Sequence, residues 1–81
     1  MMVEEIYTKV TSIFRELFDI PDLVVTPELT ADDISEWDSI SHLRLMLTIE
    51  KTFAVKFSAL QIGKLKNVGD LVALIQSKQP A

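Results

Sequence analysis

The sequence has no cysteine, and its 81 residues include only two glycines and three prolines. Without cysteine there is no disulfide framework, thiol nucleophile or cysteine-based zinc site. The scarcity of glycine and proline leaves most of the chain free to form regular structure. A hydrophobic content of 48% argues against intrinsic disorder, which requires low hydrophobicity. We therefore expect one globular domain that spans residues 1–81.

Two further absences concern membranes and nucleic acids. No apolar run approaches the roughly 20 residues that a bilayer-spanning helix needs. The acidic start, MMVEEIYTK, does not match the pattern of a signal peptide. We therefore expect a cytoplasmic protein that does not insert into membranes. The net charge of −4 argues against nucleic acid as the main partner, and a single histidine is a poor basis for a metal site.

The charged residues are divided unevenly along the chain. Seven acids and no base lie between Asp19 and Asp38, whereas five bases and a single acid, Glu50, lie between Arg44 and Lys66. This division is either an ordinary solvated surface or a bipolar surface that orients a protein partner. The pattern of charges does not by itself decide between the two.

Three long helices are predicted from apolar residues that recur at helical spacing. The first covers about residues 3–18 and stops before Pro21, which disfavours helical geometry at the preceding residue. The second runs from about residue 39 to Phe53. The last begins after Asn67 as N-cap and ends at Pro80. The apolar positions of the first and last helices are Val3, Ile6, Val10, Ile13, Phe14, Leu17, Val68, Leu71, Val72, Leu74 and Ile75.

A short helix and a long loop complete the predicted fold. Residues 58–61 have the capping-box form, and Gly63 is available to stop a helix about one turn later. Residues 19–37 are interrupted by two prolines and have room for one short turn after Thr30. The apolar residues expected to tie this loop over the bundle are Ile20, Leu23, Val24, Leu29 and Ile34. The predicted fold class is all-α: a small four-helix bundle, three main helices plus one short helix, with a long loop between helices 1 and 2.

The segment EWDSISHLRLMLTIEKTF, from Glu36 to Phe53, has more apolar residues than one buried face requires. On a helix that turns about 100° per residue, one apolar group forms a core stripe: Leu45, Met46, Ile49 and Phe53. A second apolar group consists of Ile40, Leu43 and Leu47. This second group is either buried because the helix is central, or exposed as a docking patch beside Arg44 and Lys51. The helical wheel alone slightly favours burial.

Asp38 and Ser39 lie at the start of this second helix. Asp38 can act as the N-cap, with Ser35 as a weaker rival cap. In both cases the Ser39 hydroxyl lies near free backbone N–H groups, where an anionic phosphodiester is well tolerated. Ordinary capping is the plainer explanation of a serine here. A Ser39–His42 hydrolase dyad is set aside because there is no Gly-x-Ser-x-Gly turn and no cleft is expected. No catalytic or metal-binding residue is assigned, and we do not expect an enzyme.

The tripeptide Asp38-Ser39-Ile40 resembles the Asp-Ser-Leu motif of acyl carrier proteins. The resemblance covers essentially the whole chain: its size, its acidity, the long loop before the serine and the order of the helices. Residues 49–53, IEKTF, are similar to the end of the family's second helix. Residues 67–71, NVGDL, are similar to the start of its last helix. The tripeptide in this architecture is much more specific than the tripeptide alone.

The resemblance implies that Ser39 carries covalent 4′-phosphopantetheine, taken from coenzyme A, and that acyl groups are held on its thiol as thioesters. Asp38 would help to position the serine. A phosphopantetheinyl transferase would attach the group, and acyl-loading and acyl-processing enzymes would be the other partners of a monomeric carrier. The resemblance also favours the exposed interpretation of the second apolar group. The candidate docking residues are Trp37, Ile40, Leu43, Arg44, Leu47 and Lys51.

The second helix departs from the common fatty-acid type, which is strongly acidic there. This chain has Arg44 and Lys51 in that helix, and Glu50 is its one remaining acid. Trp37 before Asp38 is more similar to specialised stand-alone carriers of secondary-metabolite, modified-lipid or cell-envelope pathways. Trp37 is either an anchor for the loop or an exposed partner contact. Two alternatives stay open: an aminoacyl or peptidyl carrier with the same serine chemistry, and a helical interaction module without a prosthetic group.

Overall fold

The computed structural model describes residues 2–79 of the chain. Its elements are α1 (Val3–Phe18), a 3-10 turn η1 (Ala31–Asp33), α2 (Ser39–Phe53), α3 (Ala59–Gly63) and α4 (Val68–Lys78), and there is no strand in the described part. The predicted all-α fold is therefore confirmed, with η1 as the short turn of the long loop. Pro80, the expected end of the last helix, lies outside the described residues.

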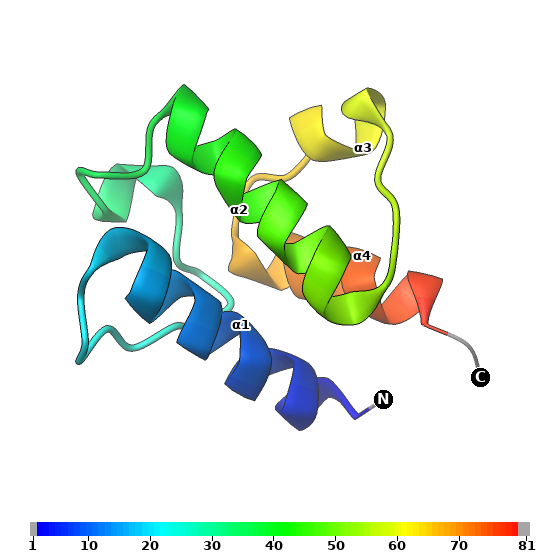
Figure 1. The fold of residues 1–81 in the computed structure, drawn as a ribbon, viewed down its shortest axis with the longest axis horizontal. Helices are drawn as coiled ribbons and strands as arrows, with labels where there is room; N and C mark the ends of the chain where they lie inside the picture. The colour runs from blue at the N-terminus through cyan, green and yellow to red at the C-terminus, as the bar shows by residue number, and fades with distance from the viewer. Residues whose placement is uncertain (1, 80–81) are drawn as a thin grey trace.

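Helices α1, α2 and α4 form the body of the molecule, and α1 contacts both of the others. Figure 1 shows α1 running toward the end of the molecule where α2 begins, and α2 running back. The start of α1 and the end of α4 lie together at the opposite end. Within residues 2–79, no helix has the length and apolarity that crossing a bilayer requires. The start of α2 therefore lies at the end of the molecule opposite the start of α1 and the end of α4.

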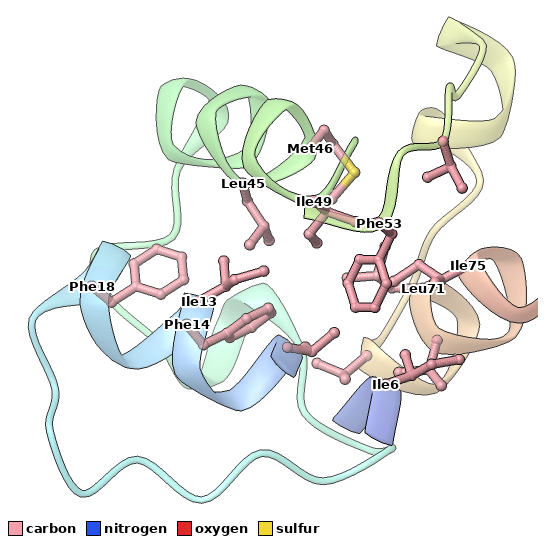
Figure 2. Packing of buried hydrophobic residues seen from close by; sticks show 14 of the residues in the cluster. Ile6, Ile13, Phe14, Phe18, Leu45, Met46, Ile49, Phe53, Leu71 and Ile75 are labelled. Carbon is pink, nitrogen blue, oxygen red and sulfur yellow. The ribbon is translucent and has the colours of Figure 1, made fainter. Parts of the chain in front are cut away.

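The hydrophobic core fills the space between these three helices. Figure 2 shows Leu45 of α2 pointing toward Ile13 of α1, with Phe14 close by. The buried residues of the helices are Ile6, Val10, Ile13, Phe14, Phe18, Leu45, Met46, Ile49, Phe53, Val68, Leu71, Val72 and Ile75. Each large apolar side chain contributes about 1.5–3 kcal/mol when fully buried. The predicted core stripe of α2 is confirmed, whereas Val3 at the start of α1 is exposed.

Side chains cap the starts of the last three helices. Asp38 accepts a hydrogen bond from the Ser41 N–H at 2.9 Å, and Asn67 accepts one from the Asp70 N–H at 2.8 Å. Residues 58 and 61 form a reciprocal capping box. Asp38 is therefore the N-cap of α2, and the rival cap at Ser35 is wrong. Gly63 is the last residue of α3, so the short helix ends where expected, although no described glycine has a positive φ.

The long loop is tied down by apolar side chains and by backbone bonds to α4. Ile34 is buried, and Ile20, Leu23, Val25 and Leu29 pack against the core. Val24 was expected to point inward but is 70% exposed, because side chains of this non-helical stretch alternate sides and Val25 takes the inner position. The Val68 and Gly69 N–H groups donate to the Leu29 and Pro27 carbonyls, both at 2.9 Å. The loop and the start of α4 are thus one packed unit.

Candidate functional site

Ser39 is the first residue of α2, and its side chain is exposed. The preceding residue, Asp38, has extended backbone angles, φ −105° and ψ −171°, so the chain turns sharply into the helix there. The first-turn N–H groups of this 15-residue helix point toward the same end. An exposed hydroxyl on a rigid helix start is accessible to a second protein and lies in the positive field of the helix.

Asp38 is an exposed carboxylate that stays ionised at neutral pH. The hydrogen bond from the Ser41 N–H favours the charged form and lowers the pKa of Asp38 below its ordinary value. This bond also fixes the backbone on both sides of Ser39, because it spans the first turn of α2. The acid predicted to position the serine is therefore adjacent to it and held in one conformation.

Trp37 anchors the loop at the point where it enters α2. Its ring packs edge-on against Phe14 at 5.3 Å between centroids and lies 5.9 Å from Phe18. Its Nε1–H donates to His42 Nδ1 at 3.1 Å. Of the two interpretations from the sequence, the structure shows the anchor, and only part of the half-buried ring is left for a partner.

His42 lies one turn after Ser39 and is half-buried. Its Nδ1 accepts the hydrogen bond from Trp37, so a neutral imidazole carries its proton on Nε2. The ring also stacks on Trp37, with 6.1 Å between centroids. His42 thus serves the packing of Trp37, which gives a structural reason for a histidine here without a catalytic dyad.

A surface groove and a small interior cavity adjoin the serine. The groove is lined by Ala31, Trp37, Asp38, Ser39, His42 and Leu43. Behind it, a cavity of about 60 Å³ lies between α2 and α4, with Met46 and Leu71 in its wall. Ala31, Trp37 and His42 line both spaces. An exposed serine beside a largely apolar groove fits a phosphodiester-linked arm. Sequence patterns pointed to the serine, but gave no sign that Trp37 and His42 pair beside it.

The second apolar group of α2 is exposed. Ile40, Leu43 and Leu47 are 71%, 59% and 62% exposed, and Arg44 and Lys51 are exposed beside them. The burial that the helical wheel slightly favoured is therefore wrong, because the core covers only the opposite face of α2 (Figure 2). Among residues 2–79, no three His, Cys, Asp or Glu side chains come together in a way that could hold a metal ion.

Comparison with known proteins gives concordant results. Residues 8–75 match the family model described as "Phosphopantetheine attachment site". The chain is 35% identical over 75 residues to an acyl carrier protein of Thermotoga maritima, with 93% of each chain covered. It is 34% identical over 73 residues to a meromycolate extension acyl carrier protein of Mycolicibacterium smegmatis, covering 90% of this chain and 74% of that one. The solution structure of a holo acyl carrier protein from Geobacter metallireducens superposes with a TM-score of 0.84 at 43% identity, covering 89% of this chain and 83% of that chain.

Proposed function

The chain belongs to the acyl carrier protein family, in which 4′-phosphopantetheine is attached covalently, and we propose that Ser39 is its attachment residue. The observation that carries this proposal is the exposed Ser39 hydroxyl at the start of α2, directly after the Asp38 cap and inside the matched residues. When attached, the group supplies a thiol that holds an acyl chain as a thioester. The chain is thus a carrier that presents cargo to enzymes and not an enzyme itself.

The residues around Ser39 favour this role. A phosphodiester on the Ser39 oxygen would lie at the positive end of the α2 dipole, an arrangement that contributes about 0.3–1 kcal/mol at an exposed site. The Asp38 carboxylate is held by the Ser41 N–H, and we propose that it positions the serine while a transferase acts. The largely apolar groove beside Ser39 would shelter part of the arm.

We further propose that the carrier acts as a monomeric single domain, residues 1–81, in the cytoplasm and in a specialised pathway. The likeness to a meromycolate extension carrier and the bases on α2 support the specialised role. The proposed docking residues are Ile40, Leu43, Arg44, Leu47 and Lys51, with the exposed part of Trp37. An aminoacyl or peptidyl cargo would use the same serine, and analysis of the group attached to protein from its native cell separates these cargoes.

Mass spectrometry tests the attachment. The protein is incubated with coenzyme A and a promiscuous phosphopantetheinyl transferase, and its intact mass is measured. We expect an adduct of one phosphopantetheine that is lost in Ser39→Ala. Ser41→Ala is the matched control, because it removes a neighbouring hydroxyl and keeps the Ser41 backbone N–H that caps α2. An unmodified protein with several transferases, or an adduct retained in Ser39→Ala, would reject Ser39 as the site.

A further inference from the structure

The outer face of α2 combines apolar and basic side chains. Arg44, Leu47 and Lys51 follow one another at helical spacing and line one side of a broad, open groove of about 1110 Å³. Leu17 of α1 lines the groove as well, and Lys56 follows beyond the end of α2. This surface, called here the α2 face, also includes the exposed Ile40 and Leu43. It offers apolar contact area with bases around it.

Two acids share the groove with these bases, Glu16 of α1 and Glu50 of α2. Glu50 is the single acid between Arg44 and Lys66, and its Oε2 accepts the Phe57 N–H at 2.7 Å. That carboxylate is half-buried and committed to the turn that follows α2. Glu16 lines the groove from α1, on the side facing Arg44 and Lys51. The three bases that line the groove, Arg44, Lys51 and Lys56, outnumber these two acids and leave a small excess of positive charge for an approaching partner.

Negatively charged side chains surround Ser39, the proposed attachment residue. Asp32, Glu36 and Asp38 are exposed on the loop that leads into Ser39, at the end of the molecule where α2 begins (Figure 1). Charge therefore changes from negative to positive along α2. A partner that matches this order binds in one orientation, because the reversed orientation places like charges together.

We propose that the α2 face docks enzymes whose complementary surface is acidic around an apolar centre; this inference rests on the proposed carrier function. Arg44, Lys51 and Lys56 attract such a surface and speed the encounter. Ile40, Leu43 and Leu47 then supply the apolar area that is removed from water on docking. An enzyme with a basic docking surface is repelled by the same bases, because like charges would be placed together.

An anionic membrane is the other surface that bases and exposed leucines attract. The charge distribution disfavours it. The protein has a net charge of −4, and acids crowd the end of α2 beside the attachment serine. A flat anionic surface that contacts Arg44 and Lys51 would also repel that end.

A charge-swap experiment tests the acidic partner. The holo-protein is offered to a fatty-acid malonyl transferase with a basic docking surface, and to a form of that enzyme with its docking bases replaced by glutamate. We expect the wild-type carrier to accept malonyl with a kcat/KM about tenfold higher from the glutamate form. Arg44→Glu/Lys51→Glu should reverse the preference, and added salt should weaken each preferred pairing. The control variant Lys9→Glu/Lys78→Glu has the same net charge as Arg44→Glu/Lys51→Glu but leaves the α2 face unchanged. It should therefore show the wild-type preference.

The possible outcomes separate the two proposals. Suppose that the glutamate form of the enzyme transfers malonyl to the loaded wild-type carrier no faster than the unmodified enzyme does. The proposal of an acidic partner is then wrong, and the carrier function is unaffected. Binding to vesicles of phosphatidylglycerol and phosphatidylcholine that Arg44→Glu/Lys51→Glu abolishes would assign the α2 face to a membrane instead. Failure to load Ser39 removes the carrier function and, with it, this inference.

Discussion

At the scale of single residues, two helices end in left-handed backbone without glycine. Asp19 after α1 has a φ of 56°, and Ala54 after α2 has a φ of 55°. An L-residue with a Cβ is disfavoured in this conformation by about 1–2 kcal/mol. At Ala54 the strain persists because the chain must turn at once into Val55, which is buried against the core.

Replacing Ala54 by glycine should therefore stabilise the protein. We expect Ala54→Gly to raise the free energy of unfolding by about 1 kcal/mol, because glycine adopts a positive φ without steric conflict. Urea denaturation measures the change. Ala73→Gly is the matched control, because Ala73 is exposed inside α4, where glycine costs about 0.5–1 kcal/mol. A loss of stability in Ala54→Gly as large as in Ala73→Gly would contradict the strained cap.

Asp38 gives the site a defined dependence on pH. Its pKa in the folded protein lies below the ordinary value of 3.8, chiefly because the Ser41 N–H donates to the carboxylate. The cap therefore stabilises α2 fully above the ordinary pKa, and its contribution is lost as the pH falls through the folded pKa. NMR titration of the Asp38 carboxyl and the Ser41 amide should show a shared midpoint below 3.8, and Asp38→Asn should abolish the amide's response. A midpoint at or above that value would refute the capping effect.

At the scale of elements, α2 has two apolar faces with different roles. Leu45 is fully buried and Leu43, two residues earlier, is 59% exposed. We expect Leu45→Ala to lower the free energy of unfolding by about 2–5 kcal/mol, because it leaves a cavity between α1 and α2. Leu43→Ala should change it by no more than about 0.5 kcal/mol. Urea denaturation of the two variants distinguishes the core face from the exposed face, and similar losses in both would contradict this division.

The sequence placed Ser39, the proposed attachment residue, on α2 better than it explained the surroundings of that serine. Asp38 as cap and Ser39 as first residue follow from local hydrogen bonding, which depends on a few neighbouring residues only. Whether Leu43 and Leu47 are buried depends on which neighbours cover α2, and the helical wheel holds no information about neighbours. The pairing of Trp37 with His42 was also missed, because it needs the loop to fold back on Phe14.

At the scale of the whole molecule, the long loop and the start of α4 approach each other closely at Gly69. A Cβ on Gly69 would lie 3.2 Å from the Pro27 carbonyl oxygen and from the Pro27 Cβ. We expect Gly69→Ala to lower the thermal unfolding midpoint and to loosen the loop, because the Gly69–Pro27 hydrogen bond must lengthen. The expected loss is about 1–3 kcal/mol. Thermal unfolding and amide hydrogen exchange of residues 27–30 measure it.

Gly63→Ala is the matched control for this change. A Cβ on Gly63 meets nothing within 4 Å, and its backbone has no positive φ. Alanine there should be neutral or stabilise by about 0.4–1 kcal/mol, because it restricts the unfolded chain. Equal effects of the two substitutions would show that the loop–α4 contact does not limit stability.

The sequence by itself determined the helices, their caps and the position of Ser39, because helical spacing and capping are local properties of the chain. It also fixed the order of the charges, with acids before α2 and bases along it. Only the tertiary structure decided which face of α2 the core covers, and that Trp37 packs inward. It also decided that Glu50 is used by the turn that follows α2. These features depend on contacts between residues distant in sequence, and such contacts exist only once the core between α1, α2 and α4 has formed (Figure 2).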